Sequence, residues 1–354
     1  MELSTVIPAF LIGLVTTFVT SLVLVLTKKY HGKLSLDGDV GVQKMHDTPT
    51  PRIGGVAIAV GFIVAGFLLP NDIQSLWLII GLAGSLAFGF GLAEDITNKV
   101  RVKWRLLATM GSGLIFAILS GYAIHSIDIG WFDLALATTV GSLAFTAFAV
   151  GGAANAINLV DGFHGLSSGT LVIILASIAL VGWRVEDPMI MIMAITMAGI
   201  VLGFLLINFP FGFLFLGDAG AYFAGYVVAA LVVMLPARHP DVSPWVSLLI
   251  VGYPVTETIV SIFRRWFSDA SAGDPDSDHL HHIVHRGPAR KVAGALGAAR
   301  FQNALTGMFM WVMPIVTFGF VAMTSMTTLN AISYLLGTIA IYVVLYYSLR
   351  SRVG

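Results

Sequence analysis

The chain contains no cysteine, and only 11% of its residues are charged. The lack of cysteine excludes disulfide bonds, thiol catalysis and thiolate metal sites. It also means that cysteine usage gives no indication of an oxidising or a reducing compartment. A soluble globular protein carries about 25% charged residues, so a chain this poor in charge is expected to reside in a membrane. The net charge is zero, which removes any bulk argument for nucleic acid as a partner.

Long apolar runs are abundant, and 57% of the residues are hydrophobic. A helix needs about 20 mostly apolar residues to cross a bilayer. The first run, from Ser4 to Thr27, is too long for a signal-peptide core, so we expect it to be retained as a span. The sequence predicts an all-α polytopic membrane protein, one domain over residues 1–354, with eleven spans that start near Ser4, Ile53, Ser75, Leu106, Asp133, Gly165, Met189, Gly217, Ser243, Ala304 and Thr328.

Lysine and arginine residues lie almost entirely in alternate gaps between these spans. Seventeen of the nineteen fall in loops 28–52, 94–105 and 264–303 or in the C-terminal tail, and only Arg184 and Arg238 lie on the other side. The positive-inside rule assigns the basic side to the cytoplasm. We therefore expect the N-terminus outside, the C-terminus in the cytoplasm and the active site on the cytoplasmic face.

The first two cytoplasmic loops contain charged clusters. The first loop holds Lys44, His46 and Arg52, which could bind phosphate; the alternative is a basic loop that contacts anionic lipid headgroups. The second holds Glu94 and Asp95, whose adjacent carboxylates suit a metal ion or a general base, and several cations that suit phosphate. The alternative is that these charges cap helix ends.

A third cluster lies at the end of an apolar run. Asn155, Asn158 and Asp161 are each three residues apart, so on a helix they form a polar strip along one side. Polar groups in a membrane helix are costly and usually face a cavity or a partner. The alternative is hydrogen bonding between helices.

A fourth candidate, Asp218, lies between Gly217 and Gly220. An aspartate among glycines can bind a metal ion while backbone amides at a helix N-terminus meet phosphate. The alternative is an ordinary helix N-cap.

Four of the nine histidines lie within the seven residues from His279 to His285, and they follow three aspartates. Clustered imidazoles with carboxylates can bind zinc, shuttle protons or bind phosphate. A solvated loop is the alternative. Hard oxygen ligands together with cations on one face favour Mg²⁺ and a substrate that carries phosphate.

The sequence resembles the polyprenyl-phosphate N-acetylhexosamine-1-phosphate transferases. The similarity follows residues 46–55, 94–105, 155–166, 217–220 and 279–282 in the family's order, and so covers nearly the whole chain. The most specific pieces are the run Asn-Ala-Ile-Asn-Leu-Val-Asp-Gly from Asn155 and the His-Leu-His-His segment from His279. They are similar to the branch that uses a simple UDP-N-acetylhexosamine, and not to the branch that uses the muramyl-pentapeptide nucleotide.

The resemblance implies transfer of N-acetylhexosamine-1-phosphate from a UDP-sugar to a polyprenyl phosphate, such as undecaprenyl phosphate, with release of UMP, as the first step of a cell-envelope glycan. It implies a multi-pass protein of the inner membrane and a Mg²⁺ ion, with Mn²⁺ as an alternative, and it leaves a homodimer open. It assigns Asp218 to the metal and Asp95, Glu94 and Asp161 to catalysis. Its candidates for substrate contact are Asn155, Asn158, His164, Lys44, His46, Arg52, Lys103, Arg105, His279, His281 and His282.

Several residues depart from the family pattern. Glu94 stands where the family usually has an aspartate, which keeps the charge but moves it by about one methylene. His164 stands where a second aspartate is frequent, which removes a negative charge. Ala221 replaces a common serine, and Phe213 lies where a basic residue is frequent. These departures bear on donor recognition, so the donor sugar and the glycan pathway stay open, as does the choice between direct attack and a covalent intermediate.

Two other classes of membrane protein compete with this interpretation. A transporter of a nucleotide sugar or a lipid-linked sugar often has repeat halves and ionisable residues near mid-bilayer. No repeat is visible here, and the polar clusters lie at one face. A CDP-alcohol phosphotransferase also has an Asp-Gly near the end of a span, but Asp161-Gly162 lacks the Ala-Arg and the spaced aspartates that would follow it.

Overall fold

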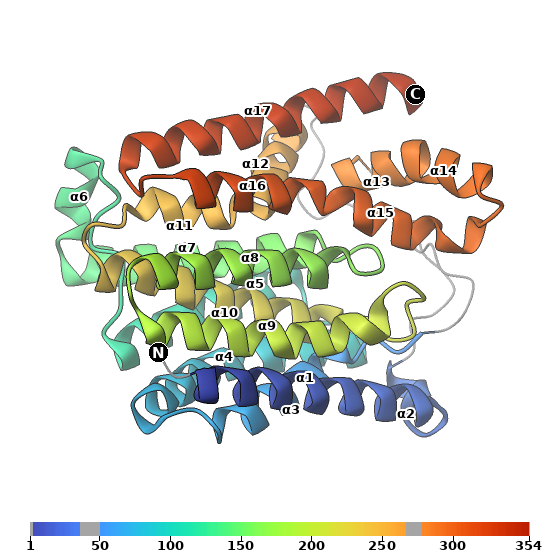
Figure 1. Cartoon of the computed structure of the whole chain (residues 1–354), viewed down its shortest axis with the longest axis horizontal. Helices are drawn as coiled ribbons and strands as arrows, with labels where there is room; N and C mark the ends of the chain where they lie inside the picture. Colours follow the sequence, from blue (N-terminus) through green and yellow to red (C-terminus); the bar gives the residue numbers. More distant parts are fainter. Residues whose placement is uncertain (1–2, 36–49, 267–277, 354) are drawn as a thin grey trace.

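The computed structural model describes residues 3–35, 50–266 and 278–353, and every regular element in these ranges is a helix. The long helices run side by side along the long axis of the molecule (Figure 1). In chain order the elements are α1 (Leu3–Leu26), α2 (Lys28–Ser35), α3 (Gly54–Gly66), α4 (Asn71–Thr97), α5 (Val102–Ser120), α6 (Gly130–Leu136), α7 (Thr139–Leu159), α8 (Leu166–Arg184), α9 (Pro188–Asn208), α10 (Gly217–Arg238), α11 (Pro244–Ile250), α12 (Gly252–Trp266), α13 (Leu280–Val284), η1 (His285–Ala289), α14 (Arg290–Ala295), η2 (Ala299–Phe301), α15 (Gln302–Met310), α16 (Val312–Met323) and α17 (Thr328–Val353).

The prediction of a polytopic helical protein is confirmed, whereas the count of eleven spans is not. Within the described residues, nine helices are long and apolar enough to cross a membrane, and a tenth span results if α11 and α12 are counted together. The remaining predicted segment, α3, has only 13 residues. The segment expected to start near Asp133 is divided, because Thr138 caps α7 by accepting a hydrogen bond from the amide of Gly141.

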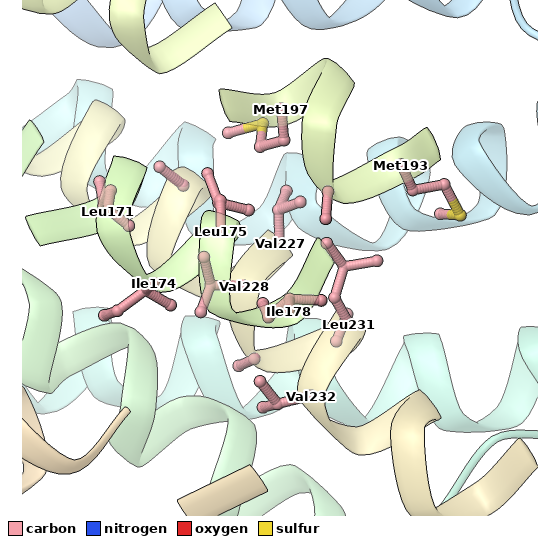
Figure 2. Close-up of a cluster of buried hydrophobic side chains, with 14 of the residues drawn as sticks. Leu171, Ile174, Leu175, Ile178, Met193, Met197, Val227, Val228, Leu231 and Val232 are labelled. Carbon is pink, nitrogen blue, oxygen red and sulfur yellow. The ribbon is translucent and has the colours of Figure 1, made fainter. Parts of the chain in front are cut away.

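Helix α10 forms the centre of the bundle. In its most apolar 18-residue window, 94% of the residues are buried, whereas the corresponding share for α1 and α17 is 22%. Helices α3, α4, α7 and α8 pack against it. Figure 2 shows the contact of α10 with α8 and α9, where Val227, Val228 and Leu231 meet Leu175 and Met197. Small residues let the backbones approach, as at Gly225, which faces Ala154 of α7.

Helices α11 and α12 are joined by a bend of 81°. Beyond the bend, α12 buries Glu257 and Ser261, whereas Ile262, Phe263 and Trp266 are exposed. An apolar surface of this kind is expected in contact with lipid. The bend therefore directs α12 away from the axis of the span that it completes.

The segments with functional candidates gather at one end of the bundle. Helices α2, α13 and α14 and the C-terminus lie at that end, and α6 lies at the other (Figure 1). The end that carries α13 is called the site end below.

Candidate active site

Asp95, in the last turn of α4, caps the N-terminus of α10. Its Oδ1 accepts a hydrogen bond from the amide of Asp218 (2.8 Å), and its Oδ2 accepts one from the amide of Ala219 (2.9 Å). The residue is only 2% exposed. A carboxylate at a helix N-terminus satisfies unpaired amides and interacts favourably with the helix dipole. Asp95 therefore fixes the backbone that carries Asp218, and its predicted catalytic role stays a prediction.

Two glycines allow α4 and α10 to meet this closely. Gly217 has a φ of +72°, and a Cβ there would lie 2.1 Å from the carbonyl oxygen of Arg52 and 2.6 Å from Oδ2 of Asp95. A Cβ on Gly91 would lie 2.6 Å from the Cα of Ala219. Any side chain at either position would separate Asp95 from the amides that it caps.

The end of the first loop pairs with the segment that precedes α10. The amide of Phe215 donates to the carbonyl of Pro51 (2.9 Å), and the amide of Gly54 donates to the carbonyl of Phe215 (2.9 Å). This pairing brings Arg52 to the site: its Nη2 lies 3.7 Å from Oδ1 of Asp95, and its Nη1 donates to Oδ1 of Asn98 at 3.3 Å.

Asp218 is held from two other helices. Its Oδ1 accepts a hydrogen bond from Nδ2 of Asn158 in α7 (3.0 Å), and its Oδ2 accepts one from Nη1 of Arg105 in α5. Hydrogen bonds to an ionised group are stronger than neutral ones. Asp218 is therefore oriented by an amide and a guanidinium while it lies beside the capped N-terminus of α10.

Asp161 follows the last turn of α7 and has a different environment. Its amide donates to the carbonyl of Asn158 (3.1 Å), but no described residue donates a hydrogen bond to its carboxylate. Burial raises the pKa of the Asp161 carboxyl to about 7; the charge of Asp218 also raises it, and Arg52 opposes the rise. A nearby cation would favour the ionised form of this carboxylate.

The histidine segment lies against the turn that carries Asp161. Nε2 of His281 is 3.5 Å from the place that a Cβ on Gly162 would occupy, and its ring meets the ring of Phe163 edge-on at 5.7 Å. His279 stacks on His281, with ring centroids 5.2 Å apart. Burial lowers the pKa of His281 well below its ordinary value, and the charges of His282, His279 and Arg264 add to the effect, so its imidazole is neutral at physiological pH.

The zinc alternative receives no support from this geometry. In the described part of the chain, no group of three or more His, Asp or Glu side chains is arranged to hold a metal ion. The imidazoles instead contact one another and Phe163: His279 stacks on His281, the rings of His281 and His282 are tilted, and His282 meets Phe163 edge-on.

Some residues predicted to bind substrate, and Glu94, which was predicted to be catalytic, have other partners. Nδ2 of Asn155 donates to Oγ1 of Thr109 and to the carbonyl of Gly151, both at 2.8 Å, so it joins α7 to α5. The exposed Lys103 places its ammonium over the ring of Trp104. An oxygen of Glu94 accepts a hydrogen bond from the amide of Val100 (2.7 Å) and closes the turn after α4. Lys44 and His46 lie outside the described residues.

His164 is buried beneath the loop that joins α9 to α10. Its Nδ1 donates to the carbonyl of Pro210 (3.0 Å), and Gly212 packs on its ring. Burial lowers its pKa, and the hydrogen bond to Pro210 acts in the opposite direction. At neutral pH the residue is an uncharged support for this loop, and a role in substrate binding stays a prediction.

Glu257 is a residue of this end that the sequence analysis did not single out. It is fully buried in α12, and its Oε1 accepts a hydrogen bond from Nδ1 of His279 (3.1 Å). A single carboxylate inside an otherwise apolar span is itself a functional signal. That signal was present in the sequence, but no motif surrounds it.

The site end thus combines two carboxylates in different environments with guanidinium groups and a cluster of imidazoles. Asp218 is oriented by hydrogen bonds, the carboxylate of Asp161 has no hydrogen-bond donor among the described residues, and Arg52 and Arg105 supply positive charge. Hard oxygen ligands suit a divalent cation, and guanidinium groups suit phosphate. Such a site in a membrane bundle suits the class of proteins that transfer phosphoryl groups at a membrane surface.

The comparisons with known proteins agree with this class. The family described as glycosyl transferase family 4 matches residues 77–236, the segment that includes Asp95, Asp161 and Asp218, so this segment of the chain is similar to that family. The chain is 27% identical over 286 residues to the probable undecaprenyl-phosphate N-acetylglucosaminyl 1-phosphate transferase of Bacillus subtilis (strain 168). This alignment covers 78% of this chain and 76% of the relative. The chain is 26% identical over 276 residues to the undecaprenyl-phosphate alpha-N-acetylglucosaminyl 1-phosphate transferase of Escherichia coli (strain K12). This alignment covers 75% of this chain and 74% of the relative.

Proposed function

We propose that this protein transfers N-acetylhexosamine-1-phosphate from a UDP-sugar to undecaprenyl phosphate and releases UMP. The names of the relatives support the acceptor and the type of group transferred. The observation that carries the proposal is the convergence of Asp218, Asn158 and Arg105, from three different helices, beside the capped N-terminus of α10. This convergence suits positioning and charge stabilisation, which are the main contributions of a protein to phosphoryl transfer.

The site end faces the cytoplasm in this proposal. The seventeen basic residues of the alternate gaps support that orientation through the positive-inside rule. The UDP-sugar then reaches the site from the cytosol, and the lipid phosphate reaches it from the inner leaflet. The protein is accordingly assigned to the inner membrane of a cell with a polyprenyl-linked glycan.

A divalent cation, Mg²⁺ or Mn²⁺, fits the donor set of this end. The carboxylate of Asp161 has no hydrogen-bond donor among the described residues, and Asp218 lies close enough to influence its pKa. One or two carboxylates are sufficient for Mg²⁺, because substrate phosphates and water complete its coordination. We assign Asp218 and Asp161 to hold the ion, which would neutralise the donor diphosphate and the UMP leaving group.

The other residues act on the substrates through hydrogen bonds and charge. Arg105 keeps Asp218 oriented and adds positive charge where the diphosphate is expected, and Arg52 does the same near Asp95. His279, His281 and His282 form the wall next to Asp161, and we assign them to the nucleotide donor. Asn158 fixes the carboxylate of Asp218 through its amide.

A transfer assay with membranes tests the proposal. Radiolabelled UDP-N-acetylglucosamine, UDP-N-acetylgalactosamine and deoxy-hexosamine nucleotides are supplied separately with undecaprenyl phosphate and Mg²⁺. We expect a labelled lipid and an equal amount of UMP with at least one donor. Accumulation of intact nucleotide sugar in sealed vesicles, without a lipid product from any donor, would favour a transporter and contradict the proposal.

A further inference from the structure

Glu257 is a buried carboxylate whose Oε1 has two hydrogen-bond donors in one short segment. Its Oε1 accepts from Nδ1 of His279 at 3.1 Å and from the amide of Leu280 at 3.2 Å. Leu280 is the first residue of α13, so Glu257 caps this helix from a different span. The contact therefore ties the histidine segment to the bent helix α12.

The burial of Glu257 makes this contact energetically important. The residue is 0% exposed, and Tyr253 and Tyr342 are buried in the same region. A charged or polar group deep in a helical bundle is costly unless it is hydrogen-bonded. Loss of the carboxylate would in turn leave the His279 ring and an amide of α13 buried without their acceptor. The carboxylate and the segment therefore hold each other in place.

The constraint on His279 extends to the turn that carries Asp161. A carboxylate only accepts hydrogen bonds, so Nδ1 of His279 carries the proton. The His279 ring stacks on His281 at an interplanar angle of 13°, and His281 lies against Gly162 and Phe163. The orientation of His279 thus limits the positions that His281 can adopt beside Asp161.

We propose that Glu257 is a positioning residue: by capping α13 and orienting His279, it holds the histidine wall in the geometry that binds the nucleotide donor. The inference rests on the proposed function, because it takes the histidine segment as part of the donor site. Glu257 itself does not touch the donor, and its effect passes through His279.

The test compares the Michaelis constants of Glu257→Ala and Glu257→Gln in the full-length protein. Glu257→Ala removes the acceptor, and we expect the KM for the UDP-sugar to rise about tenfold, a change that corresponds to about 1.4 kcal/mol, while the KM for undecaprenyl phosphate stays within about twofold. Glu257→Gln keeps an oxygen acceptor, and its donor KM should stay within about threefold of the wild type. An unchanged donor KM in Glu257→Ala, or equal losses in the two variants, would overturn the proposal.

Asp187→Ala is the matched control. Asp187 is also a buried capping carboxylate, since its Oδ1 accepts from the amide of Ile190 at 3.1 Å, but it lies at the opposite end of the bundle. A loss of folded protein lowers the maximal rate per milligram without changing KM, so this variant should leave the donor KM unaltered. A rise in donor KM equal to that of Glu257→Ala would show a general packing effect and overturn the proposal.

Glu257→Asp provides the same comparison if Glu257→Ala does not accumulate in membranes. It keeps the charge but withdraws the oxygens by one methylene, so the donor KM should rise although that of Glu257→Gln does not. In a His279→Ala background, Glu257→Asp should cause no further rise, because both changes remove the same interaction. An additive further rise would place the effect of Glu257 elsewhere and overturn the proposal.

Hydrogen exchange separates this inference from the proposed function. The amide of Leu280 should exchange faster in Glu257→Ala than in the wild type, because its acceptor is lost. A wild-type protein that transfers no sugar phosphate from any donor would contradict the proposed function, whatever the exchange result. An active wild type with unchanged Leu280 exchange in Glu257→Ala would contradict the positioning role alone.

Discussion

The two ends of the bundle use their carboxylates in opposite ways. At the end away from the site, Oδ2 of Asp187 accepts hydrogen bonds from Nε of Arg238 (2.6 Å) and Nε2 of His239 (2.7 Å), while Oδ1 caps α9. At the site end, no described residue donates to the carboxylate of Asp161. Asp187 thus belongs to a closed network within the protein, whereas the carboxylate of Asp161 has no donor in the described part of the chain.

This difference separates a structural role from a binding role. The hydrogen bonds from Arg238 and His239 hold the pKa of Asp187 below its ordinary value against the opposing effect of burial. Burial moves the pKa of Asp161 in the other direction, to about 7. The charge of Asp187 is balanced by groups of the protein itself, whereas the charged form of Asp161 has no donor among the described residues and would be stabilised by a bound cation.

The largest effect is expected from Asp218→Asn. This change keeps the shape of the side chain but removes the charge assigned to the metal ion, so turnover should fall by about 1,000-fold or more. Radiolabel transfer into lipid measures the loss, and the yield of detergent-extracted protein checks insertion. Wild-type turnover in a well-inserted variant would remove Asp218 from the metal site.

Asp161→Asn should have the next largest effect. The asparagine amide is neutral and cannot supply the negative charge of the Asp161 carboxylate. We therefore expect the activity to fall about 100-fold and the requirement for Mg²⁺ to rise. A titration of activity against Mg²⁺ concentration measures both changes. An unaltered Mg²⁺ requirement would assign Asp161 to a role other than holding the ion.

A smaller loss, on the order of tenfold, is expected from Arg105→Lys. Lysine keeps the positive charge, but it lacks the planar donor array with which Arg105 orients Asp218. The transfer assay at saturating donor measures the change in kcat. A loss equal to that of Asp218→Asn would mean that Arg105 contributes more than orientation.

The smallest effect on activity is expected from Asp187→Ala, which should instead lower the stability by about 2 kcal/mol, because a cap and its ion pairs are lost. Since the folded-state pKa of Asp187 is lowered, its contribution is present at neutral pH and is lost as the pH falls below about 4. Thermal unfolding in detergent across pH 3–7 measures this contribution. A stability difference between wild type and variant that does not shrink between pH 7 and pH 3 would contradict it.

Much of the fold could be predicted from the sequence, because apolar runs separated by basic gaps strongly constrain a membrane protein. The number of spans could not be predicted in the same way. Hydropathy does not distinguish the 13 residues of α3 from a full span, and it gives no sign of the 81° bend before α12. Both features depend on how neighbouring helices pack.

The sequence allowed the residues of the candidate site to be predicted, but not how their side chains are arranged. The spacing of Asn155, Asn158 and Asp161 indicates one polar strip, yet Asn155 turns to Thr109 and Asn158 to Asp218. The partner of each amide is set by which helix lies opposite, and the sequence spacing of a single helix does not contain that information. The capping of α10 by Asp95 likewise requires the close approach at Gly91.

The enclosure of α10 has a consequence for how the protein responds to its surroundings. This helix has almost no contact with the bilayer, and its first turn carries Asp218. Changes in lipid order, membrane thickness or temperature act first on the outer helices, and they reach Asp218 only through the packing of those helices on α10. Turnover should therefore vary little among host membranes of different acyl composition, provided that both substrates can still enter.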